Sequence, residues 1–242
     1  MNDTGITECA NATTNGLACN DAMDGTDLFP EQDAEYGRDV THNDDSDGRA
    51  GFSFTKLGSD GSALAIQNGV WSDSGSEVTG TKWSCIEDNV TGLIWEVKTN
   101  NDTPDLHDME WSYSWYSTDA ASNGGEVGTA DAGDNCLDDS RCDTEKYVAD
   151  VNAAALCGFT DWRLPEREEL RSIFDYSKSV MPSIDADWFP NSDAVVPWVW
   201  TVSTYAYNDE TTKAWLLNFN GTGDSAFGKS MQLHIRLVSG GV

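Results

Sequence analysis

The chain has 242 residues, and its 42 Asp and Glu against 14 Lys and Arg give a formal net charge of −28. This charge excludes nucleic acid as a partner, because phosphate binding needs a basic surface. The 10 Trp, 7 Tyr and 8 Phe exclude a disordered acidic chain, since such chains lack the aromatic side chains that build a core.

The first half of the chain predicts three short strands and a long insertion. The sequence GFSFTKL at 51–57 alternates, which is typical of a short strand with Lys56 on the same side as the two Phe. Two more strands are predicted near 82–86 and 92–98, joined by a turn. The polar stretch 99–142 is long enough to be an insertion of the kind that often carries function. No run of about 18 apolar residues occurs, so no transmembrane segment is expected.

Helical signals begin late in the chain. Asp143 and Thr144 are N-cap types, and apolar residues at helical spacing run from there to Gly158. Pro165 marks the first turn of a second helix, since the acidic residues after it suit the positive end of a helix dipole. After Pro190 the period changes to two and predicts three antiparallel strands, with the sequences VPWVWTVSTYAY, KAWLLNFN and MQLHIRLV. Two helices followed by an antiparallel sheet form an α+β fold.

Counting with a period of two assigns these strand residues to two faces. One set is expected to form a single buried face: Trp198, Trp200, Val202, Trp215, Leu217, Phe219, Leu233, Ile235 and Leu237. The other set, with the adjoining loop residues, is expected to be exposed and to contact a ligand: Thr201, Ser203, Tyr205, Tyr207, Asn208, Asn218, Asn220, Asp224, Phe227, Lys229, Gln232 and His234. Tyr rings stack on sugars or peptides at low entropy cost, and amides offer both a donor and an acceptor.

Two alternatives to this ligand surface stay open. The residues of the outward set are also what ordinary solvent-facing strands contain, because single exposed aromatic residues need no functional explanation. If the sheet face does not bind, the aromatic insertion at 111–116 is the next candidate.

Six cysteines are present, and two close pairs each enclose a polar, loop-like stretch. The expected disulfides are Cys9–Cys19, Cys136–Cys142 and, from the two that remain, Cys85–Cys157. The absence of a C-x-x-C motif and the presence of only three His disfavour zinc. Disulfides indicate an oxidising compartment, so the protein is expected to be secreted or displayed on a cell surface, with its export signal removed.

The acidic first part of the chain predicts an affinity for hard cations such as Ca²⁺. Within it, NDDSDG resembles the first half of an EF-hand loop, with Asn43, Asp45 and Asp47 as candidate metal ligands. Phe54 stands where such a loop needs its bidentate Glu, so a plain loop of Asx turns is the alternative. We therefore expect that no cofactor is required and that Ca²⁺ is the ion the chain would accept.

Motifs of catalysis are absent or out of context. The stretch from Gly223 to Ser230 satisfies the P-loop expression, but MQLHIRLV follows it and alternates like a strand, whereas a P-loop needs a helix there. We therefore favour a glycine-rich hairpin loop. His107, between two Asp, is expected to be a surface histidine rather than a member of a metal or acid–base cluster. No Ser–His–Asp signature, HExxH or dinucleotide fingerprint is present, so the chain is not expected to be an enzyme.

Three blocks of the sequence stand out together: DNVTGLIWEVKT at 88–99, GFTDWRLPEREELRSIFDYS at 158–177 and KAWLLNFNGTGDSAFGKSMQLHIRLVSGG at 213–241. These blocks resemble the C-terminal domain family of the Legionella collagen-like adhesin. The resemblance covers residues 85–241, whereas residues 1–84 are similar only loosely. Members of this family are similar to C-type lectins, in which two helices pack on a twisted antiparallel sheet with long loops.

The resemblance implies a C-type-lectin-like domain at 82–242, with an acidic, loop-rich extension at 1–81 that packs on it or leads into it. It also implies a secreted or surface-displayed bacterial adhesin or receptor-type module that recognises a glycan or protein ligand. A sulfated glycosaminoglycan, as attributed to the named adhesin, should be repelled by a net charge of −28 unless Ca²⁺ bridges the two. The alternatives are a structural subunit of an extracellular assembly and a secreted hydrolase. No oligomeric state is predicted.

Overall fold

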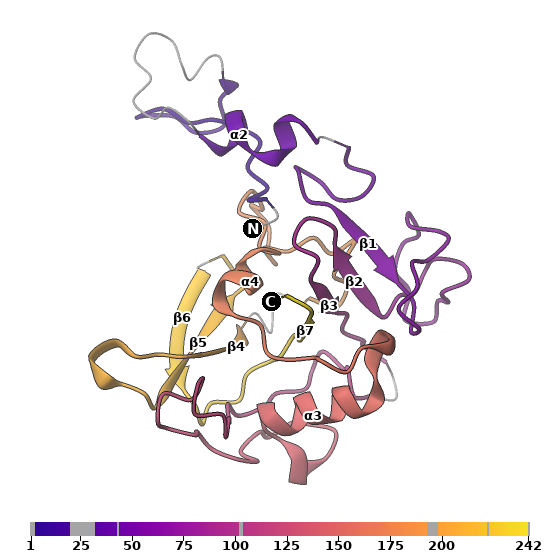
Figure 1. The fold of residues 1–242 in the computed structure, drawn as a ribbon. Helices are drawn as coiled ribbons and strands as arrows, with labels where there is room; N and C mark the ends of the chain where they lie inside the picture. Colours follow the sequence, from indigo (N-terminus) through magenta and orange to yellow (C-terminus); the bar gives the residue numbers. More distant parts are fainter. Residues whose placement is uncertain are drawn as a thin grey trace.

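Two antiparallel sheets organise the chain in the computed structural model, which describes residues 3–19, 32–42, 44–101, 104–192, 198–221 and 223–241 (Figure 1). The first sheet has the strand order β1-β2-β3-β7 and the second has the order β4-β5-β6. The strands are β1 (Phe54–Leu57), β2 (Cys85–Asp88), β3 (Ile94–Glu96), β4 (Trp198–Thr204), β5 (Lys213–Asn218), β6 (Gly223–Gly228) and β7 (Val238–Ser239). The helices are α2 (Asp33–Tyr36), α3 (Thr144–Ala154) and α4 (Arg167–Arg171), with 3₁₀ turns η1 (Arg38–Val40), η2 (Asp139–Arg141), η3 (Leu156–Gly158) and η4 (Tyr207–Asp209).

The strands predicted in the first half of the chain are confirmed. β2 pairs with β3, and β1 pairs with β2, so the segment 1–81 supplies the edge strand of the first sheet. Lys56 lies on the buried side of β1 with the two Phe, as predicted. Its Nζ donates to the backbone oxygen of Gly69 at 2.9 Å and lies 3.9 Å from the centre of the Trp83 ring. The ammonium group is therefore buried against an aromatic face, which partly offsets its loss of water.

The N-terminal segment also docks on the rest of the chain through the buried Asp175. The carboxylate of Asp175 accepts a hydrogen bond from Arg49 Nη1 at 2.9 Å, and the neighbouring Tyr176 N donates to the backbone oxygen of Thr4 at 2.9 Å. A Cβ at Gly5 would lie 2.2 Å from the Asp175 carboxylate, so only glycine fits at this approach. In Figure 1, α2 stands apart from both sheets, whereas β1 lies within the first sheet.

Both predicted helices form, but the second starts later than predicted, because Pro165 lies before its N-cap Glu166 instead of in its first turn. The carboxylate of Asp143 accepts from Lys146 N at 2.9 Å and starts α3. α4 is short, and Glu166 with Glu169 forms a reciprocal capping box at its start. Among the described residues, no helix combines the length and the apolar character needed to cross a bilayer.

The position predicted for the last strand is wrong. The strand that pairs with β5 is β6, which occupies the stretch interpreted as a hairpin loop. Gly221 has a φ of +89°, a conformation that glycine adopts freely, so the chain can reverse directly after β5. Residues 231–237 run as irregular chain from the second sheet toward β7 of the first, and His234 bridges to Val199 on the way.

The centre of the second sheet is buried on both faces, so the prediction of a single buried face is wrong. Trp200 and Leu216 lie opposite each other and pack into one aromatic core, whereas Val199 and Leu217 point the other way into a second core. Trp198 is 39% exposed, and Val202 and Trp215 are half-buried. The other expected members are buried but divide between the two cores: Trp200, Leu233, Ile235 and Leu237 in one, Leu217 and Phe219 in the other.

All three expected disulfides are confirmed. Cys85–Cys157 joins β2 to η3 within the core, Cys9–Cys19 closes an N-terminal loop, and Cys136–Cys142 lies in the insertion before α3. No free cysteine is present among the described residues.

The two disulfides of the main body should differ in their effect on stability. Removing Cys85–Cys157 with paired Ala substitutions is expected to lower the free energy of unfolding by about 4 kcal/mol, because this bond closes a loop of 72 residues. Removing Cys136–Cys142 should cost about 2 kcal/mol, since it closes only six. Urea unfolding of both double variants measures the difference, and the reverse order of the two losses would contradict the expectation.

A buried carboxylate connects the first sheet to three other parts of the chain. Glu96 is fully buried, and its Oε1 accepts from Lys98 Nζ at 2.9 Å, His107 Nδ1 at 2.8 Å and the Tyr147 hydroxyl of α3. Its Oε2 accepts from Leu237 N at 2.9 Å. Burial alone would raise the pKa of Glu96, but the Lys98 charge and the hydrogen bonds outweigh it and hold the pKa far below its usual range. The expectation of a surface role for His107 is therefore wrong, because this ring is part of the buried cluster.

Glu96→Gln is expected to lower the free energy of unfolding by about 3 kcal/mol or more at neutral pH, because it leaves the Lys98 ammonium buried without its counter-charge. The wild-type stabilisation is complete above the ordinary pKa of Glu, 4.5, and falls as the pH drops below that value, since the folded state holds the carboxylate ionised. Urea unfolding from pH 7 to pH 3 should therefore show a flatter acid decline for the variant. Glu110→Gln, at an exposed side chain, is the matched control and should change stability by less than about 0.5 kcal/mol.

Candidate functional site

A bulge in β4 divides the surface that the sequence predicts for ligand contact. β4 pairs with β5 at Trp200–Leu216 and next at Thr204–Ala214, so β4 carries two extra residues between these pairs. A bulge of this kind bends its strand and re-aims the side chains beyond it. Beyond it, next to α4, five side chains gather that we call the Trp215 face: Arg167, Ser203, Tyr205, Trp215 and Asp224.

The indole of Trp215 is held in place from two sides. The Arg167 guanidinium carbon lies 4.8 Å from the centre of the Trp215 ring, a cation–π contact. The Tyr205 ring packs edge-on against Trp215 with 4.9 Å between centroids, and the Tyr207 ring lies 6.2 Å from that of Tyr205. Tyr207 is 66% exposed. The three rings therefore form a partly open aromatic row that starts at α4 and ends in solvent.

The charged groups of the Trp215 face are paired with one another. Arg171 of α4 makes a bidentate pair with Asp224, with N···O distances of 2.9 and 2.6 Å, and Arg167 Nε lies 3.6 Å from the same carboxylate. The Ser203 hydroxyl donates to Glu166 at 2.8 Å. Such bidentate pairs fix geometry as well as charge, so the guanidinium groups are preorganised before any ligand arrives.

This arrangement is suited to recognition. A shallow pocket lies over the face, between α4 and β4. The Trp215 ring in this pocket can stack on a sugar or an apolar side chain. At the rim, the half-exposed guanidinium of Arg167 can donate hydrogen bonds and the exposed carboxylate of Glu166 can accept them. In a chain with a net charge of −28, a face whose ions are mutually paired is also one that a ligand can approach without strong repulsion.

The structure brings only some of the predicted ligand residues together. Ser203, Tyr205 and Asp224 lie on the Trp215 face, and Tyr207 and Asn208 lie beside it in η4. Thr201 is a correction, because it is buried and its hydroxyl donates to the Trp215 backbone oxygen at 2.9 Å. The remaining members of the predicted set lie elsewhere: Asn218, Asn220, Phe227, Lys229, Gln232 and His234.

Phe227 lies on the opposite face of the sheet from Trp215. It pairs with Ala214, whose side chain points into the Trp200 core, and its ring packs against Trp198 at 5.3 Å. Tyr205 and Phe227 therefore cannot form one contact surface. Period-two counting fails here because the chain assigned to the third strand is not the strand that pairs with β5.

Lys229 is a second correction, because it is buried. Its Nζ donates to the backbone oxygens of Asn123 at 2.9 Å and Glu126 at 2.5 Å, and it lies 4.1 Å from the centre of the Trp115 ring. It therefore fastens the insertion to the second sheet and cannot reach a ligand. Burial lowers the pKa of Lys229 to about 8, although the Glu126 charge opposes this effect.

The aromatic insertion at 111–116 is mostly structural. Tyr113 and Trp115 are buried, and the Trp115 Nε1 donates to the Thr201 backbone oxygen at 2.9 Å. Tyr116 is half-buried and lines a mostly apolar pocket with Val148 and other residues. This pocket is one part of the insertion that remains accessible.

The candidate EF-hand residues hold their own loop together. Asn43 lies outside the described residues. Asp45 accepts from Ala50 N at 3.2 Å, and Asp47 accepts from the Ser53 hydroxyl at 2.5 Å. These bonds agree with the alternative of a loop of Asx turns.

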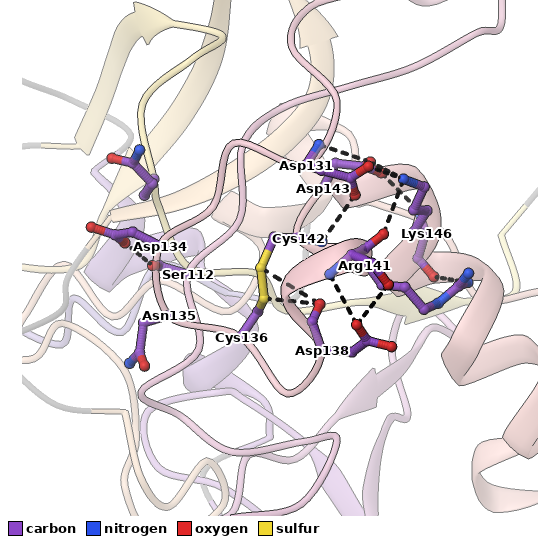
Figure 2. Close-up of a disulfide and its surroundings, with 12 residues drawn as sticks. Ser112, Asp131, Asp134, Asn135, Cys136, Asp138, Arg141, Cys142, Asp143 and Lys146 are labelled. Carbon is purple, nitrogen blue, oxygen red and sulfur yellow. Dashed lines mark hydrogen bonds and ion pairs between the residues drawn. A yellow bond between two sulfur atoms is a disulfide. The ribbon is translucent and has the colours of Figure 1, made fainter.

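Near α3, within the described part of the chain, one group of metal-type side chains converges: Cys136, Asp139 and Cys142. Its two sulfurs are joined in a disulfide and are not free to bind a metal. Figure 2 shows that the nearby carboxylates of Asp131 and Asp143 turn toward Lys146. We therefore derive no metal site from this cluster.

Sequence reasoning missed Trp215 and Arg167 as members of the face. The alternation in KAWLLNFN correctly places Trp215 on the same side as Leu217, but only the Leu217 end is covered by the second core. Arg167 is part of the predicted second helix, and its contact with Trp215 joins residues that are far apart in the sequence. No local pattern signals such a contact.

Comparison with known proteins yields one match. The family model described as the Lcl C-terminal domain matches residues 84–239. No curated protein and no solved structure matches the chain. The mixed helix and sheet architecture with two antiparallel sheets is therefore observed, whereas its C-type-lectin-like character stays a prediction.

The burial of Lys229, which removes this residue from the predicted ligand surface, can be tested directly. In an NMR titration that follows the Lys side-chain methylenes, Lys229 should titrate with a midpoint near pH 8, because burial disfavours its charged form. The exposed Lys213 is the control, and its pKa is raised by its hydrogen bond to Glu210. Since the folded pKa of Lys229 lies below the ordinary value of 10.5, its contribution to stability should rise as the pH increases from about 8. A midpoint for Lys229 equal to that of Lys213 would place its ammonium in solvent and contradict the burial.

Proposed function

Because the chain belongs to the Lcl C-terminal domain family, we propose that it is a bacterial binding module of the adhesin type that acts outside the cell and recognises a glycan or protein ligand. The family is linked to the cell surface. Three disulfides fit an oxidising compartment, where such bonds persist.

The observation that carries the proposal is the Trp215 face. It combines a half-buried indole, a partly open row of Tyr rings and preorganised guanidinium groups on one side of a sheet. Rigid aromatic and Arg side chains are the residue types that dominate binding energy in protein interfaces. The ligand in this proposal stacks on Trp215 and Tyr205 and exchanges hydrogen bonds with Arg167 and Glu166.

We place the chain with binding proteins rather than with hydrolases. The polar groups of the face are engaged with each other, as Ser203 is with Glu166 and Arg171 with Asp224. This suits fixed recognition better than proton transfer, which needs a group free to exchange its proton with a substrate. The proposal requires no cofactor, and a chelator arm in the experiment separates Ca²⁺-dependent from Ca²⁺-independent binding.

Trp215→Ala should weaken binding at least tenfold, to any ligand that the wild type selects from glycan and protein arrays, because an aromatic anchor contributes more than about 1.4 kcal/mol. Trp198→Ala is the matched control, since it removes a partly exposed Trp from the opposite face of the same sheet. Arrays are read in Ca²⁺ and in chelator, and affinities of the hits are measured by calorimetry. Equal affinity of wild type and Trp215→Ala, with melting temperatures unchanged, would move the site to the pocket at Tyr116.

The structural-subunit alternative is tested on the same samples. Size-exclusion chromatography with and without Ca²⁺ should show no concentration-dependent assembly if the chain works as a binding module. Open-ended assembly in either condition, abolished by neither Trp variant, would favour a structural role instead.

A further inference from the structure

A second pocket lies between the insertion, the start of α3 and the end of β4, and we call it the Tyr116 pocket. It has a volume of about 300 Å³, the size at which ligand pockets begin. Its apolar walls include four side chains that are partly or fully buried: Tyr116, Val148, Leu164 and Val202. Ser203 and Thr204, the next residues of β4, line the pocket over the Trp215 face instead. The Tyr116 pocket is therefore a separate site.

The walls of this pocket are fixed by hydrogen bonds between distant segments. At the start of α3, the Thr144 hydroxyl accepts from Tyr116 N at 2.9 Å and donates to the Tyr116 backbone oxygen at 2.8 Å. Val202 N donates to the Pro165 backbone oxygen at 2.9 Å, which ties the end of β4 to the chain before α4. The pocket is thus formed before a ligand arrives, which lowers the entropy cost of binding.

The rim of the Tyr116 pocket is acidic. Glu145 of α3 and the exposed Asp119 lie on it, together with Arg163. Arg163 is paired with Glu169 through two contacts of 2.7 Å, so its charge is balanced. Thr118 holds the Glu145 carboxylate at the rim, because its N donates to Oε2 at 2.5 Å and its hydroxyl donates to Oε1 at 3.0 Å. An apolar pocket with carboxylates at its mouth suits an apolar group that ends in a positive charge.

We propose that the Tyr116 pocket takes the side chain of a lysine from a protein ligand. The aliphatic stem lies against Val148 and Val202, and the ammonium group lies at the Glu145 carboxylate, where it keeps part of its water. Lysine suits this carboxylate better than arginine does, because an ammonium acts as a point charge. The bidentate fork of a guanidinium would compete with the two hydrogen bonds that Thr118 already makes to Glu145.

The charge of the chain favours a protein over an anionic glycan as the partner. With a net charge of −28, the chain attracts a basic protein as it approaches and repels a sulfated or carboxylated glycan. The inference rests on the proposed function and narrows its ligand to a protein with an exposed lysine.

The first test uses two small probes. Hexylammonium joins an unbranched apolar stem to an ammonium group, and hexanoate carries the opposite charge on a similar stem. NMR follows the methyl resonances of Leu164 and Val202 in the whole chain at equal ionic strength. Hexylammonium should shift both resonances along a saturable curve, with a Kd at least tenfold below that of hexanoate. Equal binding of the two ions, or no shift with either, would overturn the proposal.

Two variants assign this binding to the pocket. Glu145→Gln removes the rim charge and Val148→Asn makes one wall polar, so each should raise the hexylammonium Kd at least fivefold. The matched controls are Glu110→Gln and Val90→Asn, at exposed positions outside the lining of the pocket, and both should bind like the wild type. Glu145→Gln decides the matter if Val148→Asn does not fold. Equal Kd values for Glu145→Gln and Glu110→Gln would contradict the proposal.

The second test concerns the partner. The protein ligands that the wild type selects from the arrays are acetylated at their lysines, which removes the charge of each side chain. Their affinity should fall at least tenfold, and the fall should be smaller for Glu145→Gln. Arrays that return glycans only, or protein ligands that acetylation leaves unchanged, would overturn the assignment to lysine. The proposed function is judged separately by Trp215→Ala, so the two proposals can fail independently.

Discussion

One carboxylate, Glu96, fastens the first sheet to the 99–142 insertion, to α3 and to the segment before β7. It stands at the end of β3, and its two oxygens reach Lys98, His107, Tyr147 of α3 and the backbone of Leu237 next to β7. Apart from the neighbouring Lys98, each partner comes from a different part of the chain, so the cluster acts as a long-range constraint that no single element supplies. Its geometry satisfies the condition under which a buried ion pair is tolerated, namely that the remaining lone pairs are hydrogen-bonded. Removal of this one charge would leave a cation stranded in the core.

The exposure of the Trp215 face depends on how the second sheet is covered. Because Trp200 and Val199 point into different cores, the centre of this sheet is packed on both sides. The bulge after Trp200 ends that regular packing and releases the Tyr205 end of β4 next to α4. The Trp215 face therefore exists where the second core stops. An aromatic side chain on the central strand of a sheet, held by Arg167, is fixed in position before any ligand arrives.

Four cations lie buried in the described part of the chain, beside six buried Asp and Glu side chains. Each buried cation lies against an aromatic ring: Lys56 on Trp83, Lys98 on Tyr147, Lys229 on Trp115 and Arg236 on Phe189. Cation–π contacts and backbone oxygens offset part of the cost of removing these groups from water. In a chain with a net charge of −28, the Trp215 face is a place where the charged side chains are locally paired.

The secondary structure in the first half of the chain, the two helices and the three disulfides follow from the sequence alone. Most of these features depend on local chemistry: alternation in β1, the side-chain cap of Asp143 on α3, and two pairs of cysteines close together in the chain. Cys85–Cys157 spans 72 residues and is predicted only because the other four cysteines are already paired. The family also follows from sequence, since its motifs are contiguous blocks.

Tertiary structure alone decided where the last strands pair and which face is open. The period-two pattern of MQLHIRLV is that of a strand, yet β6 takes the place beside β5, because the turn after Gly221 brings it there first and local alternation does not specify a partner. The sequence also does not determine that Lys229 is buried or that Trp215 is partly exposed. Each depends on a contact with a residue distant in the chain: Lys229 contacts Asn123, and Trp215 contacts Arg167. A single sequence carries the preference of each side chain for water or for the core, but the neighbours that satisfy that preference are chosen only when the whole chain packs.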